Sequence, residues 1–263
     1  MSTSTLNTDK DSGVESAANL KPKEHGAYAI LAIPMLTAII SAGPTIVGIC
    51  VAGASIAGFL AHEPLLVALG HRGARAQRTT PAAQHRLGVL LWTTVICGVV
   101  AIVIGSTDVR YALVACGVLA LISFMIAIAG KHRTLGGQLW GIVGLSVPCV
   151  PILLAGQQSP LLTVEAWATW LIGFGATTLA VRGVIAAQKR QTRAFHMSVV
   201  GGLSVAVAVL TASGFTLPIV TLPMVAMAWY LLFAPPPAKQ LRRVGWSLVA
   251  GTVASACWMA AIL

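Results

Sequence analysis

The chain has 263 residues, of which 57% are hydrophobic and only 9% are charged, and its mean hydropathy is +0.85. Soluble proteins carry about 25% charged residues, so this composition excludes a soluble globular protein. The formal net charge of +10 could indicate nucleic-acid binding. Basic loops held at the cytoplasmic face of a membrane explain the charge better. We therefore expect a membrane protein without a nucleic-acid partner.

The first 20 residues are polar and lack the apolar core of a signal peptide. We expect residues 1–20 to form a disordered cytoplasmic tail and residues 21–263 to form one membrane domain. The cysteines lie in apolar segments without a CxxC pair, so they are expected to pack as small core residues. They are Cys50, Cys97, Cys116, Cys149 and Cys257.

Nine apolar segments approach the length of about 20 residues that a bilayer-spanning helix needs. In chain order they are 26–42, 45–69, 87–105, 111–130, 139–155, 166–187, 197–212, 215–233 and 244–263. The sequence thus predicts an all-α polytopic bundle of nine transmembrane helices. Trp167 and Trp170, at the outer start of the sixth segment, fit an interfacial aromatic belt. In-span prolines are expected to kink helices, through plain packing or around an internal cavity: Pro34, Pro148, Pro151, Pro218 and Pro223.

The basic residues alternate between the two sides of these segments. Of the 17 Lys and Arg residues, only Arg110 falls outside the N-terminal tail, the loops of one side and the helix ends beside them. The excess of positive charge on cytoplasmic loops therefore predicts an N-terminus inside and a C-terminus outside. Asp108 and Glu165 fall at the opposite, outer turns, where we expect them to be solvated.

Two charged residues fall deep in predicted spans. Glu63 precedes the basic loop after the second span by several residues, and Arg182 precedes Lys189 in the same way after the sixth. The segments 59–65 and 178–184 align as a faint internal repeat with an offset of four spans. A charge at such depth costs about 3 kcal/mol and usually faces the interior with a partner. Two interpretations stay open: an ion pair that locks two helices, and a ligand or catalytic site.

Other polar groups gather at the same face. They are Glu24, His25, His62, Arg72, Arg75, His132, Arg133 and Gln138. Because Arg binds phosphate oxygens in a bidentate way, a basic cavity here suits a phosphate or diphosphate headgroup with an apolar tail in the bilayer. Mg²⁺ could bridge phosphate to Glu24 or Glu63, since it needs only one or two protein carboxylates. The adjacent histidines leave a transition-metal site as an alternative.

Several segments resemble the YwiC-like family of bacterial integral membrane proteins. The resemblance rests on KPKEHGAY, FLAHEPLL, GHRGAR, HRTLGGQ and TLAVRGVI, at 21–28, 59–66, 70–75, 132–138 and 178–185. The start containing Glu24 and His25 is its most specific element. Members of that family tend to have glutamate where this chain has Gln138, so an acid role there departs from the family pattern. The resemblance implies a multi-pass protein of the bacterial cytoplasmic membrane, but no particular reaction.

A wider resemblance is to the UbiA prenyltransferase superfamily. That fold also has nine helices with an inner N-terminus, and its sites lie after the second and sixth spans. Its aspartate-rich motifs, which bind Mg²⁺ and diphosphate, are replaced here by His62 and Glu63 and by Arg182. The resemblance therefore implies a UbiA-like bundle with a lipid-diphosphate pocket more than it implies prenyl transfer.

Three functions follow from these observations. In the first, the protein binds an isoprenoid or another phosphate-bearing lipid and could transfer it. Glu24 and Glu63 would then be catalytic or hold Mg²⁺, and the histidines, arginines and Gln138 would bind the substrate. In the second, the protein transports a small solute, with Glu63 coupled to protons. In the third it is a non-catalytic membrane scaffold. Membrane lipids are partners in all three, and the oligomeric state stays open.

Overall fold

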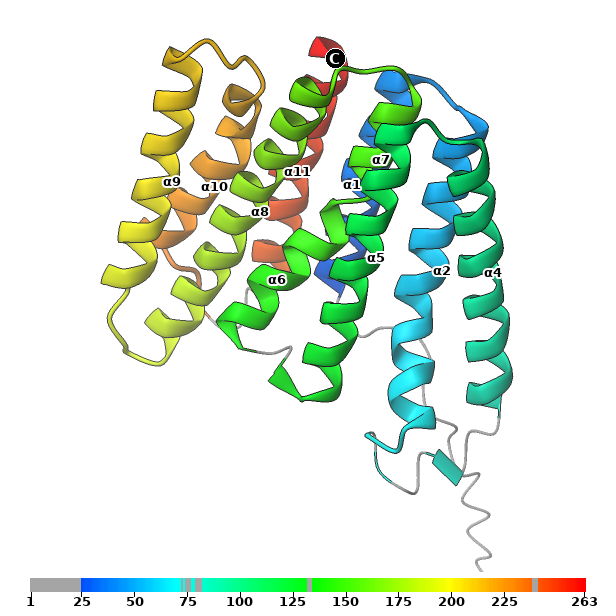
Figure 1. Cartoon of the computed structure of the whole chain (residues 1–263). Helices are drawn as coiled ribbons and strands as arrows, with labels where there is room; N and C mark the ends of the chain where they lie inside the picture. The colour runs from blue at the N-terminus through cyan, green and yellow to red at the C-terminus, as the bar shows by residue number, and fades with distance from the viewer. Residues whose placement is uncertain (1–24, 72, 74–76, 79–81, 132–133, 238–240) are drawn as a thin grey trace, which may run out of the picture.

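The computed structural model describes residues 25–263 apart from 72, 74–76, 79–81, 132–133 and 238–240. The predicted tail over 1–20 lies outside this part. Within the described residues the chain is helical and has no strand (Figure 1). The helices are α1 His25–Ala42, α2 Ile46–Ala68, α4 Ala82–Ile104, α5 Thr107–Ile128, α6 Leu135–Ser146, α7 Cys149–Ala155, α8 Pro160–Gln188, α9 Ala194–Ala212, η2 Pro218–Thr221, α10 Leu222–Phe233 and α11 Leu241–Ile262.

Seven helical segments among the described residues are long and apolar enough to cross a membrane, with α6 and α7 together forming one of them. Two further apolar segments, Gly26–Ala42 and Pro218–Phe233, are shorter. The all-α membrane class is therefore confirmed, whereas nine crossings stay a prediction. The segments run up and down in one bundle, and the chain ends at the upper end in Figure 1.

Side-chain caps set where several helices begin. Thr134 Oγ1 accepts a hydrogen bond from Gly137 N at 3.1 Å, and Ser159 Oγ accepts one from Leu162 N at 3.3 Å. Such caps satisfy N–H groups that the first helical turn leaves without partners. As a result, α6 and α8 begin four and six residues before the predicted starts at 139 and 166. The hydropathy pattern missed these turns because they contain small and polar residues.

Two predicted spans are interrupted near prolines. The fifth consists of α6 and α7, which meet at Val147 and Pro148, and the eighth begins with the 3₁₀ helix η2 at Pro218. Proline lacks the backbone N–H that the helical ladder needs. Pro34, in contrast, lies within the continuous helix α1. The in-span prolines thus interrupt two of the predicted spans, although 139–155 still lies within one segment, Leu135–Ala155, that is long enough to cross a membrane.

The packing is centred on α8. It contributes to both buried hydrophobic clusters, one shared with α1, α7 and η2 and the other with α9 and α10. Trp170 is 2% exposed and stacks on Phe174 with ring centroids 5.6 Å apart. Trp170 therefore packs on the side of α8 that faces the interior, and its level in the membrane stays a prediction.

The cysteines divide between the interior and the surface. Cys149 is buried, whereas Cys257 is exposed on α11. The other three are half-buried, and all five are free thiols. The expectation of core packing is thus correct for Cys149 and wrong for Cys257.

Candidate functional site

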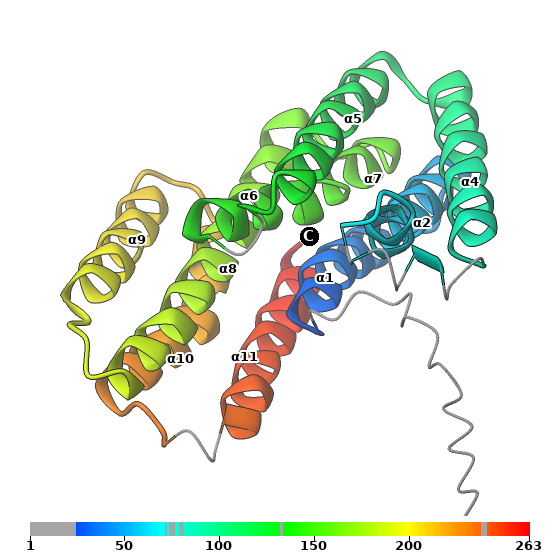
Figure 2. The same ribbon diagram turned by 90° about the horizontal axis from the view of Figure 1, so that it is seen from below.

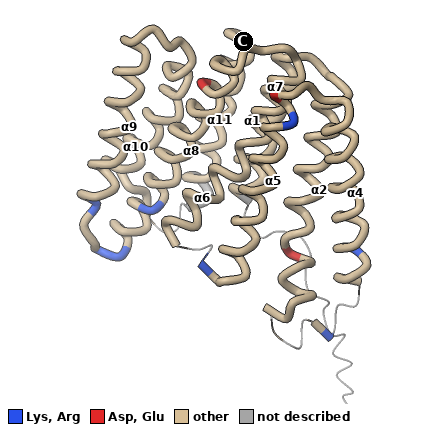
Figure 3. The backbone as a smooth tube through the Cα atoms, in the orientation of Figure 1, with Lys and Arg blue, Asp and Glu red and all other residues tan. Residues whose placement is uncertain are grey.

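Basic residues gather at one end of the bundle. Figure 3 shows nearly all of the drawn Lys and Arg at the lower end, which agrees with the pattern predicted from the loops. Arg110 is the exception, and it has a local role. Its guanidinium donates to the carbonyls of Ile102 and Val103 at 2.9 and 3.3 Å, in the last turn of α4. Basic side chains commonly stabilise helix C-termini in this way. The lower end is therefore the basic end of the protein, defined by the loops α2–α4, α5–α6, α8–α9 and α10–α11.

Arg182 and Gln138 come together at the basic end, although they were predicted separately. Arg182 lies in α8, two turns before its end, and is half-buried. Its Nε donates to Oε1 of Gln138, on α6, at 2.8 Å. This bond fixes the plane of the guanidinium and joins two helices. The amide accepts the bond, so Gln138 positions a cation here and has no need of an acid function.

His196 is a third polar residue beside this pair, and the sequence reasoning missed it. It lies in the first turn of α9, and its Cβ and Cγ would be 3.5 and 3.7 Å from a side chain at Gly183. Its Nδ1 is buried and has no hydrogen-bond partner within the described residues. Buried polar atoms usually have a protein or water partner, so this nitrogen is available to a ligand or to water.

A second group of polar and aromatic residues lies near Glu63 in the sequence of α2. Glu63 is 3% exposed, so it faces the interior of the protein as predicted. The neighbouring His62 stacks on Phe124 of α5, with ring centroids 5.9 Å apart, and Phe59 meets Tyr28 of α1 edge to face at 4.9 Å. Pro64 follows Glu63 inside the continuous helix, so it cannot donate to the carbonyl of Leu60. This stretch of α2 thus combines a buried carboxylate, two aromatic contacts to other helices and a carbonyl that lacks its helical donor.

The two groups lie on helices with different neighbours. Helix α2 packs mainly on α4 and α7, whereas α8 packs mainly on α10, α9, α6 and η2. Seen from below, α1 lies between α2 and α8 (Figure 2), and it contacts both. An ion pair between Glu63 and Arg182 therefore stays a prediction. The hydrogen bond to Gln138 is a side-chain contact that the structure gives for Arg182.

Most of the remaining predicted site residues belong to segments that the structure does not describe. Glu24, Arg72, Arg75, His132 and Arg133 lie outside the described residues. His25 is the first residue of α1. Their roles therefore stay predictions.

The available donor groups limit which metal ion the protein could hold. Among the described residues there is no group of three or more His, Cys, Asp or Glu side chains that could hold a metal ion. A transition metal usually needs such a group. Mg²⁺ needs fewer protein ligands, because phosphate oxygens and water complete its shell. The buried carboxylate of Glu63 thus fits a Mg²⁺ ion only in company with a phosphate-bearing ligand.

Glu165, at the opposite end, differs from its predicted place in a solvated turn. It lies inside α8 and is half-buried. Its Oε1 accepts a hydrogen bond from Leu217 N, directly before η2, at 2.7 Å. Asp108, by comparison, is exposed in the first turn of α5, as expected for a solvated residue. The solvated prediction for Glu165 is therefore wrong, because α8 begins earlier than hydropathy indicates.

Comparison with known families gives one match. The sequence model of the family described as YwiC-like protein matches residues 22–154, half of the chain. This range contains nearly all of α1 to α7 and includes Glu63 and Gln138, while Arg182 follows it. No curated protein and no solved structure matches the chain significantly.

Proposed function

Since the chain belongs to the YwiC-like family, we propose that this membrane protein binds a phosphate-bearing lipid, such as an isoprenoid diphosphate, at its basic end. The observation that carries the proposal is the half-buried Arg182, held in plane by Gln138 at 2.8 Å. Charged side chains at membrane depth are costly and usually serve a ligand or a pathway. An arginine whose plane is set in advance suits phosphate oxygens, which accept two parallel hydrogen bonds.

The proposal includes an orientation and a division of roles. All nine apolar segments would cross a bacterial cytoplasmic membrane, with the basic end in the cytoplasm. Arg182 would hold the phosphate together with Arg72, Arg75 and Arg133, which belong to loops on the same side of the predicted spans. His25, His62, His132 and Gln138 would complete the binding site. This arrangement is supported by the alternation of basic and short turns along the chain.

Glu63 and Glu24 would supply the acidic chemistry of the site. A Mg²⁺ ion, if bound, would neutralise phosphate charge. The buried carboxylate of Glu63 could hold that ion or accept a proton. If the lipid group is transferred, departure of an allylic diphosphate would be favoured by the positive charge at Arg182. The proposal thus includes a UbiA-like helix bundle that could also transfer the lipid group.

Lipid recovery from the purified protein tests this function. We expect mass spectrometry to find a phosphorylated lipid with the wild type and about tenfold less with Arg182→Gln, because a charged hydrogen bond is worth about 1.5–3 kcal/mol. Arg182→Lys should lose part of the lipid, since it keeps the charge without the planar group. Lys189→Gln is the matched control, because Lys189 is exposed at the end of the same helix. Equal lipid in Arg182→Gln and Lys189→Gln, or none in the wild type, would exclude the proposal.

Transport of a small solute is the second candidate. It is favoured by the interruptions between α6 and α7 and between η2 and α10, because transporters often bind substrate at interrupted helices. Uptake into vesicles that is lost in Glu63→Gln, without recovery of a phosphorylated lipid, would favour transport over lipid binding.

A further inference from the structure

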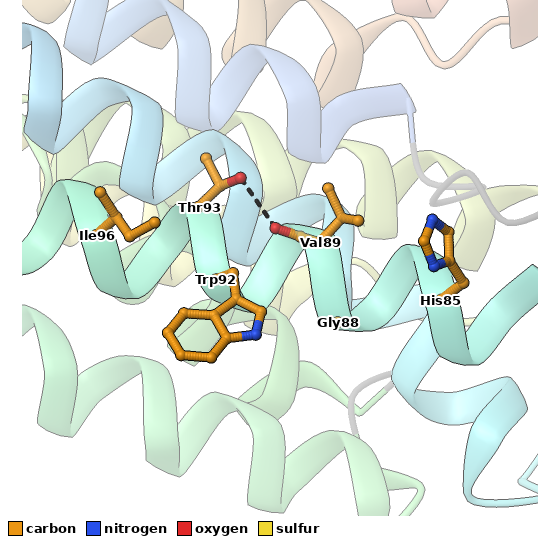
Figure 4. A pocket seen from close by; sticks show the side chains of 6 residues that line it. All are labelled: His85, Gly88, Val89, Trp92, Thr93 and Ile96. Carbon is orange, nitrogen blue, oxygen red and sulfur yellow. Dashed lines mark hydrogen bonds between the residues drawn. The ribbon is translucent and has the colours of Figure 1, made fainter.

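Helix α4 carries a shallow groove of about 480 Å³ on one face. The groove is lined by His85, Gly88, Val89, Trp92, Thr93 and Ile96, which follow one side of the helix in Figure 4. From the first to the last of these residues the helix rises by about 16 Å. The lining residues therefore form a continuous stripe rather than an isolated hollow.

This stripe points away from α2, the main neighbour of α4. Thr94 Oγ1 donates to the carbonyl of Ala54 on α2 at 3.4 Å, and Cys97 Sγ would be 3.5 Å from a Cβ at Gly53. Helical residues advance by about 100° each, so the centre of the groove lies on the side opposite Thr94 and Cys97. Trp92 is 66% exposed. In a membrane this face meets lipid.

The chemistry of the groove changes along its length. Gly88 has no side chain, so it leaves a hollow between His85 and Trp92, one turn to either side (Figure 4). The Thr93 hydroxyl donates to the carbonyl of Val89 at 2.9 Å, so it presents no unused donor. Beyond it lies the aliphatic Ile96. The groove is thus polar near His85 and apolar at the other end.

Charge at the polar end favours an anion. His85 lies in the first turn of α4, which begins at Ala82, and Arg86 follows it. Helix α4 contains no Asp or Glu. The N–H groups of the first helical turn and the helix dipole attract negative charge at this end. A phospholipid has a phosphate group followed by an apolar chain. The groove has the same polar-to-apolar order, from His85 through Gly88 and Trp92 to Ile96.

We propose that this groove binds an anionic glycerophospholipid of the surrounding bilayer. The phosphate lies at His85 and the start of α4, and one acyl chain follows Gly88 towards Ile96. The groove contains none of the residues of the proposed lipid site, which include Glu63 on α2, Gln138 on α6 and Arg182 on α8. It makes the protein sensitive to the anionic lipid content of its membrane.

Fluorescence quenching by brominated lipids tests the proposal on the full-length protein in vesicles. The fluorescence of Trp92 is obtained by subtracting the tryptophan fluorescence of Trp92→Phe from that of the wild type. We expect half-maximal quenching of Trp92 at an about fivefold lower mole fraction of brominated phosphatidylglycerol than of brominated phosphatidylcholine, as expected for one basic group near a membrane surface. Equal quenching curves for the two lipids would overturn the proposal.

Two glycines of the same helix provide a matched pair of variants. A Cβ at Gly88 or at Gly98 meets no atom within 4 Å, so α4 accommodates a side chain at both positions. Only Gly88 lines the groove. Gly88→Leu should abolish the fivefold preference, and Gly98→Leu should keep it. The same quenching in both variants would contradict the proposal. Should Gly88→Leu fail to fold, His85→Ala decides: loss of the preference supports the site, and an unchanged preference overturns it.

Discussion

Helices α8 and α4 belong to the same bundle but meet different surroundings. In its most apolar 18-residue stretch, α8 is 61% buried inside the protein, whereas α4 is only 6% buried. The exposed helix is the more apolar of the two, and the packed helix carries Thr163, Thr169, Gly173, Gly183 and Arg182. Lipid tails cannot satisfy polar groups, while small residues let helices approach closely. Inside a membrane, therefore, strong hydropathy marks the face that meets lipid rather than the core.

Glycine substitutions give the largest expected difference between these helices. A Cβ at Gly183 would overlap the side chain of Leu232 on α10 and approach His196, whereas a Cβ at Gly88 meets nothing within 4 Å. Gly183→Val should therefore lower the free energy of unfolding by about 1–3 kcal/mol. Gly88→Val should change it by less than about 0.5 kcal/mol. Thermal unfolding in detergent measures both, and equal midpoints would show that α8 is not the packed helix.

The two acids at the upper end of the bundle give an intermediate effect. Glu165 on α8 accepts the backbone N–H of Leu217 at 2.7 Å, whereas Asp108 is exposed at the start of α5. Glu165→Ala should cost about 1–2 kcal/mol, because η2 loses its partner. Asp108→Ala should cost about 0.3–1 kcal/mol, from the helix dipole alone. Hydrogen exchange at Leu217 gives a local measurement, and unchanged protection in Glu165→Ala would contradict the role of this carboxylate.

Hydroxyl groups give the smallest difference. Ser146 Oγ accepts a hydrogen bond from Trp167 Nε1 at 3.1 Å and joins α6 to α8, whereas Thr93 on α4 donates to Val89 of its own helix. Ser146→Ala should cost about 1 kcal/mol, since it leaves the indole N–H without its acceptor. Thr93→Val should stay within about 0.5 kcal/mol. Denaturant unfolding checks the pair, and a larger loss for Thr93→Val would reverse the comparison.

The candidate site was predictable only in part. The depths of Glu63 and Arg182 follow from their distance to the basic loops, and Glu63 is indeed buried. The bond between Arg182 and Gln138 joins residues 44 positions apart, and no spacing rule indicates it. The sequence did not indicate a site role for His196, because a histidine in the first turn of an apolar helix resembles a loop residue. Only its contact with α8 at Gly183 identifies it.

The sequence by itself determined the membrane class, the approximate position of each apolar segment and the basic end of the bundle. Each of these depends on local composition, because the cost of placing a short segment in a bilayer is set by that segment's own side chains. Only the tertiary structure decided that α8 is buried and α4 is exposed, that Arg182 meets Gln138, and that Glu165 binds Leu217, 52 residues away. Such contacts depend on which faces of distant helices pack together, and apolar character alone does not distinguish a face towards lipid from a face towards protein.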